Sequence, residues 1–139
     1  MLHIGFGDVL QEEVLRRVGL AERFLAEGRE LVDRDPVQAS EKLYKAAEEA
    51  VKALATALNL PEAKKAVESG SRWSKLLERA AQSIAKALKV KELVLWWDTA
   101  FKLYVDGFHK AKLDSDSVRE RYEYIEAMVN IAKKVMQKR

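Results

Sequence analysis

The chain has 139 residues, of which 48% are hydrophobic and 34% charged, and its formal net charge is +3. This length suits one domain with one core, so we expect residues 1–139 to fold as a single unit, and the hydrophobic share argues against disorder. The absence of cysteine excludes disulfides, thiolate zinc sites and cysteine nucleophiles. No stretch has the roughly 20 mostly apolar residues of a membrane span, and residues 1–8 lack a secretory signal, so we expect a cytoplasmic protein without membrane contact.

Few prolines and glycines interrupt a chain rich in good helix formers, which favours helices throughout. Apolar residues at helical spacing predict a first helix over about residues 8–33. Asp35 suits a helix N-cap and Pro36 the first helical position, so a second helix is expected from Pro36 to about Asn59. Its charged residues are predicted to lie outside: Glu41, Lys45, Glu48, Glu49 and Lys52. A short helical turn over 61–67 follows, and then a loop at 69–71.

Three further helices are expected, over about residues 71–88, 91–109 and 115–137. The helix over 91–109 is apolar around most of its circumference, so we expect it at the centre of the fold. Ser117 and Glu120 have the spacing of a capping box at the start of the last helix. Amphipathic segments without strand alternation predict an all-α, up-and-down bundle of four to five helices.

Positive charge gathers in residues 63–91, which hold eight basic and two acidic side chains. Four of the basic residues recur at intervals of three, four and seven, which predicts one basic face on the third helix: Arg72, Lys75, Arg79 and Lys86. Such a stripe can bind the phosphates of a nucleotide or of RNA. The alternative is a solvated helix face that pairs with acids elsewhere.

A single polar strip interrupts the apolar helix over 91–109, formed by Asp98, Lys102, Asp106 and His109. If the strip is buried, its charges are paired and His109 can act as an acid–base group near neutral pH. If it faces solvent through a gap in the bundle, it is structural. With only two histidines and no Glu-x-x-His pair, no metal is expected, and no cofactor-binding or hydrolase motif occurs.

Trp96 and Trp97 are adjacent and point about 100° apart on a helix, so one core is not expected to hold both. An exposed tryptophan there would indicate an interface with another protein.

Several segments resemble the PaREP family of archaeal paralogous helical proteins: 38–55, Asn59-Leu60-Pro61, Arg72-Trp73-Ser74 and 97–109. The resemblance covers nearly the whole chain. It implies a bundle of the HEPN type, similar to nucleotidyltransferase substrate-binding subunits. HEPN domains commonly dimerise and work beside nucleotidyltransferases or as toxin ribonucleases, so the resemblance predicts a homodimer and offers a nucleotidyltransferase as a partner.

HEPN ribonucleases place a catalytic His after an Arg, with four to six residues between them. Lys102 and His109 match this spacing, but lysine lacks the planar bidentate fork of arginine. We therefore favour a non-catalytic module that binds nucleotide or nucleic-acid phosphates through the basic stripe. Two alternatives stay open. One is a metal-independent ribonuclease in which His109 is the acid–base, Lys102 steadies the phosphate, and Asp98 or Asp106 orients them. The other is a structural partner that docks through Trp96 and Trp97.

Overall fold

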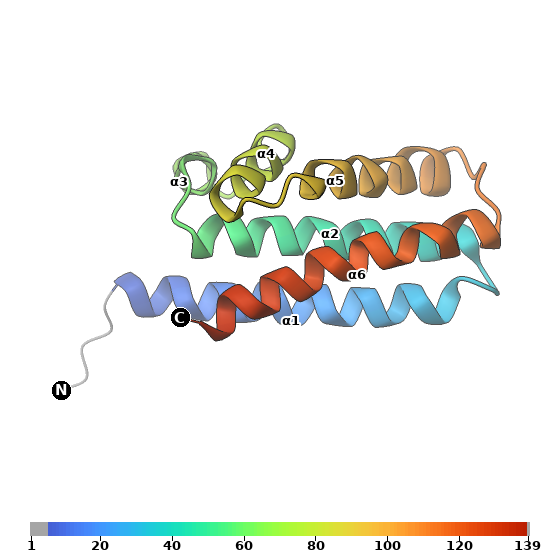
Figure 1. The fold of residues 1–139 in the computed structure, drawn as a ribbon, viewed down its shortest axis with the longest axis horizontal. Coiled ribbons are helices and arrows are strands. Elements are labelled where there is room, and N and C mark those ends of the chain that lie inside the picture. The colour runs from blue at the N-terminus through green and yellow to red at the C-terminus, as the bar shows by residue number, and fades with distance from the viewer. Residues whose placement is uncertain (1–5, 139) are drawn as a thin grey trace.

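The computed structural model of this chain describes residues 6–138, which fold into helices joined by short connections (Figure 1). The helices are α1 (Phe6–Leu31), α2 (Pro36–Ala57), α3 (Pro61–Glu68), α4 (Leu77–Leu88), α5 (Glu92–Lys102), the π-helix η1 (Leu103–His109) and α6 (Ser115–Gln137). No strand occurs in this part of the chain, so the predicted all-α class is confirmed. None of the described helices is long and apolar enough to cross a bilayer. Of the two histidines considered for a metal site, His3 lies outside the described residues.

Local signals place two helix starts. The Asp35 carboxylate accepts a hydrogen bond from the Gln38 amide at 3.1 Å, and Pro36 occupies the first turn of α2, as predicted. At the start of α6 the cap is Asp114, whose carboxylate accepts from the Ser117 amide at 2.8 Å. The capping box predicted at Ser117 is therefore wrong, because Ser117 already lies within the first turn.

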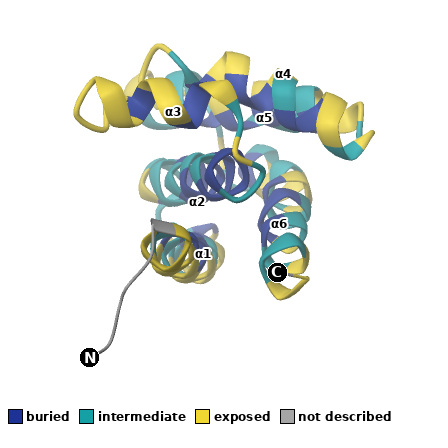
Figure 2. Cartoon of the chain, turned by 90° about the vertical axis from the view of Figure 1, so that its left-hand side faces the viewer, coloured by how far each residue is buried: buried dark blue, intermediate teal, exposed yellow. Residues whose placement is uncertain are grey.

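The central helix is α2. It packs against α1, α6, η1 and α4. Figure 2 shows α3, α4 and α5 on one side of α2, α1 on the opposite side, and α6 beside both α1 and α2. The prediction that residues 91–109 form the centre is wrong, because α5 leaves Leu95 64% and Phe101 51% exposed. Alanines on several sides of α2 let neighbouring helices approach it closely. The hydrophobicity of α2 alone did not reveal that it is the central helix.

A buried ionic network ties α1 to α2. Glu49, predicted on the outside of its helix, is only 8% exposed, and its carboxylate lies 3.3 Å from the buried guanidinium of Arg17 in α1. The Lys52 ammonium lies 3.5 Å from the same carboxylate, and Glu13 pairs with Arg17 at 3.0 Å. The prediction for Glu49 fails because α1 covers that side of α2.

Residues 71–76 are not helical, although a helix was predicted from residue 71. Gly70 and Ser71 have positive φ angles of 74° and 67°, which turn the chain away from a helical path. The turn buries Trp73, and the Arg17 guanidinium lies 5.9 Å from the centre of its ring. The helix begins only at Leu77, so Arg72 and Lys75 lie before α4.

The last helical stretch before α6 is continuous from Glu92 to His109, close to the predicted range, but its second part winds as the π-helix η1. Gly107 brings η1 directly onto α2, where Ser40 lies. Such π-turns widen a helix and frequently occur at functional sites.

Candidate functional site

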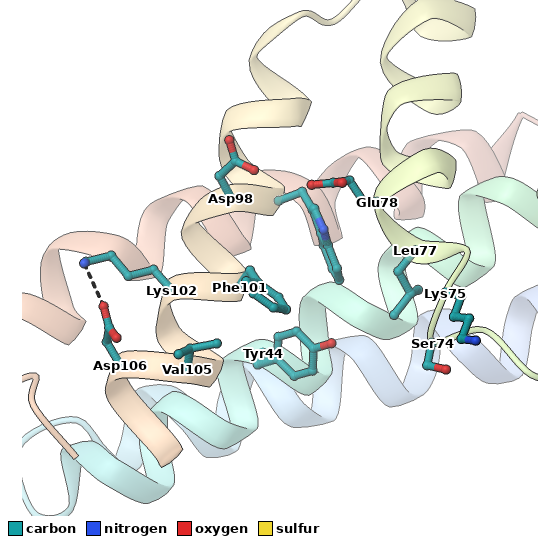
Figure 3. A pocket seen from close by; sticks show the side chains of 11 residues that line it. Tyr44, Ser74, Lys75, Leu77, Glu78, Asp98, Phe101, Lys102, Val105 and Asp106 are labelled. Carbon is teal, nitrogen blue, oxygen red and sulfur yellow. Dashed lines mark hydrogen bonds and ion pairs between the residues drawn. The ribbon is translucent and has the colours of Figure 1, made fainter. Parts of the chain in front are cut away.

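A groove of about 740 Å³ lies where α4 and α5–η1 meet above α2 (Figure 3). We call it the α4–α5 groove, and its lining residues are Tyr44, Ser74, Lys75, Leu77, Glu78, Trp97, Asp98, Phe101, Lys102, Val105 and Asp106. Its size is in the range of small-molecule sites. The groove unites Lys75 of the predicted basic stripe with Asp98, Lys102 and Asp106 of the polar strip.

The polar strip faces solvent. Asp98, Lys102 and His109 are exposed and Asp106 is half-buried, so of the two arrangements considered from the sequence, the structure has the solvent-facing one. The Lys102 ammonium donates to the Asp106 carboxylate at 2.9 Å, and this hydrogen bond is the main reason that the pKa of Asp106 is lowered. His109 is not among the groove residues, and its ring packs edge-on against Tyr104 with centroids 4.5 Å apart.

Tyr44 of α2 forms the floor of the groove. Its ring stacks on Tyr104 at 4.2 Å between centroids and lies 5.8 Å from the Trp97 ring. Tyr44 is 9% exposed, and its hydroxyl takes part in no hydrogen bond between described residues. Burial, with a smaller contribution from Glu48, raises the pKa of this hydroxyl well above its usual value, so it stays protonated at neutral pH.

Sequence reasoning missed Tyr44 as a site residue. The signal that could have found it is a tyrosine among the mostly small and aliphatic residues that α2 buries. A buried tyrosine hydroxyl normally finds a partner, so its position there predicts either a hydrogen bond or an opening.

Two unpaired carboxylates lie at the rim of the groove. Glu78 comes from the first turn of α4 and Asp98 from α5, and neither takes part in an ion pair between described residues. In Figure 3 both carboxylates lie at one end of the groove, away from the ion pair of Lys102 and Asp106. Since three carboxylates and two ammonium groups line the groove, its lining is negative overall.

The predicted basic stripe is divided by the fold. Arg79 and Lys86 lie two turns apart on one face of α4, but Arg72 and Lys75 precede the helix, so the prediction of one helical face is wrong for these two. All four side chains are exposed.

Lys86 instead belongs to a second concavity, of about 500 Å³, at the turn between α4 and α5. We call it the lysine pocket, and its lining residues are Gln82, Ala85, Lys86, Lys89, Lys91 and Val94. None of these residues is acidic, and none of the ion pairs between described residues involves its three lysines. The sequence pattern singled out Lys86, but it did not associate Lys91 with it.

The two adjacent tryptophans diverge, as predicted. Trp97 is 4% exposed and faces Tyr44, whereas Trp96 is half-buried against the core. The predicted docking surface made of both indoles is therefore not formed, and Leu95 is the exposed apolar residue beside them. In residues 6–138 no group of three or more His, Asp or Glu side chains is placed to hold a metal ion.

Comparison with known proteins gives a family and two solved structures of one relative. A sequence model of the archaeal PaREP1/PaREP8 family matches residues 16–129. The chain is 33% identical to a Sulfolobus solfataricus protein of known crystal structure, with a TM-score of 0.74, over 84% of this chain and 95% of that one. It is 35% identical to a solution structure of the same target, with a TM-score of 0.73, over 85% of this chain and 92% of that one. No curated protein matches. The chain belongs to the archaeal PaREP1/PaREP8 family.

Proposed function

We propose that this protein is a non-catalytic binding module that holds phosphate groups of a nucleotide or nucleic acid in the lysine pocket. The observation that carries the proposal is the convergence of Lys86, Lys89 and Lys91 on one concavity without an acid. Each ammonium group is free to contact an anion, because none is engaged in an ion pair with a described residue. Binding of phosphate to such groups releases counterions and is therefore sensitive to salt.

The surroundings of the lysine pocket suit such a ligand. Ala85 and Val94 supply an apolar surface for a sugar or base, and Gln82 adds a hydrogen-bonding amide. Arg79, two turns before Lys86 on the same face of α4, extends the positive surface along the helix.

The positions of Lys102 and His109, the two residues of the predicted ribonuclease motif, support the non-catalytic form of the proposal. Lys102 is bound to Asp106 rather than free to steady a phosphate, and His109 packs on aromatic rings outside the groove. The net negative lining of the α4–α5 groove also opposes an anionic ligand there. These positions give less support to the ribonuclease alternative with its Lys102 and His109 pair.

The family resemblance adds two proposals, a HEPN-type bundle and a homodimer. The mass of one chain is 15.8 kDa, so multi-angle light scattering distinguishes a monomer from a dimer directly. A dimer would agree with the resemblance, and a monomer at all concentrations would contradict it.

The experiment is a salt titration of binding with two probes, ATP and a short single-stranded oligouridylate. Three lysine–phosphate contacts predict a slope of log affinity against log salt of about −2 for the oligonucleotide. The double variant Lys86→Glu and Lys89→Glu should lose binding and flatten the slope. The matched control, Lys134→Glu and Lys138→Glu, reverses two exposed charges at the end of α6 and should retain most of the affinity.

The two probes separate the two sources of phosphate. Binding of ATP identifies a nucleotide site, and binding of the oligonucleotide alone identifies a nucleic-acid site. Absence of binding by both probes at low salt, or an equal loss in the control variant, would reject the proposal.

A further inference from the structure

The α4–α5 groove holds three polar groups that the phosphate proposal does not use. The Tyr44 hydroxyl lies at its floor, and the carboxylates of Glu78 and Asp98 lie at its rim (Figure 3). None of the three has a hydrogen-bond or ion-pair partner among the described residues. Glu78 and Asp98 are exposed, whereas Tyr44 is 9% exposed. A buried tyrosine normally finds a hydrogen-bond partner for its hydroxyl, so a hydroxyl without one that borders an open groove points to a ligand.

We propose that the α4–α5 groove binds a small organic cation, an amine or quaternary ammonium that also carries a hydroxyl or similar polar group.

The charges of the groove call for one positive group. Lys102 is neutralised by Asp106 at 2.9 Å, which leaves Lys75 opposite Glu78 and Asp98. In Figure 3 the Lys75 side chain lies beside Ser74, away from the two carboxylates. A monovalent cation between Glu78 and Asp98 would balance the lining, whereas an anion would increase its imbalance.

The walls of the groove suit a cation as well. Trp97, Phe101 and Tyr44 all line it, and the negative faces of aromatic rings attract ammonium groups, tryptophan most strongly. Trp97 and Asp98 are neighbours on α5, so one element supplies both a ring and a carboxylate to the same cavity.

The floor provides the second contact. Tyr44 is nine-tenths buried, and the stacking of its ring on Tyr104 fixes its direction. Its hydroxyl, drawn in Figure 3 inside the ring of lining residues, can donate to or accept from a polar group on the ligand. Recognition therefore requires two points, a positive nitrogen near the rim and a polar atom near Tyr44.

This site is independent of the proposed function. The lysine pocket lies at the turn between α4 and α5, and the groove lies toward the opposite ends of these two helices, with no lining residue in common. Either site can fail its test without affecting the other.

The test uses choline as the probe, because it joins a quaternary nitrogen to a hydroxyl. Titrations are followed by the indole N–H signal of Trp97 in nitrogen–proton correlation spectra at constant ionic strength. The neutral isostere 3,3-dimethylbutan-1-ol has the same shape without the charge. We expect saturable choline binding and about tenfold or greater weakening for the neutral alcohol. Ethanolamine, which is choline without its three N-methyl groups, shows whether methyl groups on the nitrogen matter.

Three variants locate the ligand. Glu78→Gln and Asp98→Asn should each weaken choline binding several-fold, whereas Glu123→Gln, an exposed acid of α6, should leave it unchanged. Tyr44→Phe should weaken the binding of choline but not that of tetramethylammonium, which lacks the hydroxyl. Thermal unfolding of each variant verifies that the fold is retained.

Several results would overturn the proposal. The first is equal affinity for choline and its neutral isostere. The second is no saturable shift of the Trp97 signal with choline or ethanolamine up to about 10 mM. The third is unchanged binding in both Glu78→Gln and Asp98→Asn. If Tyr44→Phe weakens the binding of choline and of tetramethylammonium equally, the Tyr44 hydroxyl does not contact the ligand. Tyr44 then has only a structural role.

Discussion

Gly107 of η1 lies directly against Ser40 of α2, so that a Cβ atom at position 107 would stand 2.6 Å from the Ser40 Cβ. The Ser40 hydroxyl donates to the Pro36 carbonyl at 2.8 Å, so it has little freedom to move aside. Through this contact the helix that carries one wall of the α4–α5 groove rests on the central helix.

Gly107→Ala should therefore destabilise the protein, although alanine is the better helix former. The overlap with Ser40 forces the helices apart, at an expected cost of about 1–3 kcal/mol in the free energy of unfolding. Urea denaturation measures the change.

The control for this substitution is Gly19→Ala, within α1, where nothing lies near the added Cβ. It should stabilise the protein by about 0.4–1 kcal/mol, because it lowers the conformational entropy of the unfolded chain. A Gly107→Ala protein as stable as the Gly19→Ala protein would contradict the close contact.

The adjacent residues Glu48 and Glu49 should respond very differently to removal. Glu49→Ala takes a carboxylate from buried Arg17, and the loss of one partner of a buried pair costs about 3–5 kcal/mol. Arg17 keeps Glu13, so we expect the lower end of that range.

Glu48→Ala is the matched control, because half-buried Glu48 has Lys52, at 3.4 Å, as its one ion-pair partner among the described residues. Its removal should cost less than about 1 kcal/mol. Similar unfolding midpoints for the two variants would show that the network around Arg17 does not stabilise the fold.

The ion pair of Lys102 and Asp106 makes a prediction about pH. The hydrogen bond from Lys102 lowers the pKa of Asp106 below its usual value, with smaller effects of Lys110 and Lys112. A carboxyl whose pKa is lower in the folded state stabilises the protein above its unfolded value, and this stabilisation disappears as the pH falls through the folded pKa. Carbon-detected NMR of the Asp106 carboxyl as a function of pH measures the pKa in the folded state.

Lys102→Gln should raise the titration midpoint of Asp106 toward its usual value, and Lys110→Gln should raise it less. If both variants leave the midpoint where it was, the hydrogen bond is not present in solution.

The non-catalytic proposal also predicts an enzymatic result. We expect the purified protein to leave single-stranded RNA intact in the presence of a chelator, and His109→Ala to behave in the same way. Metal-independent cleavage that is lost in His109→Ala and in Lys102→Ala would contradict this proposal and favour the ribonuclease alternative.

The helices themselves were largely predictable from the sequence, because their signals are local. Asp35 and Pro36 start α2 as expected, and the segment after Pro61 forms a helical element at its expected place. Such features depend on side chains within one or two turns of each other. The all-α fold class follows from the same short-range patterns.

Local spacing misled the prediction where distant contacts outweighed it. Residues 71–76 fit a helical pattern, but the burial of Trp73 beside Arg17 and the left-handed turn at Ser71 keep them irregular. The helical spacing of Glu49 predicts an outer position, but α1 covers that side of α2 and Arg17 pairs with the Glu49 carboxylate.

The sequence by itself determined where most helices run and which faces are apolar, since these depend on residues three or four positions apart. Only the tertiary structure decided that α2 is central, that the polar strip faces solvent, and that Tyr44, Glu78 and Asp98 border one groove. The reason is that these properties depend on contacts between helices far apart in the chain, which helical spacing does not encode.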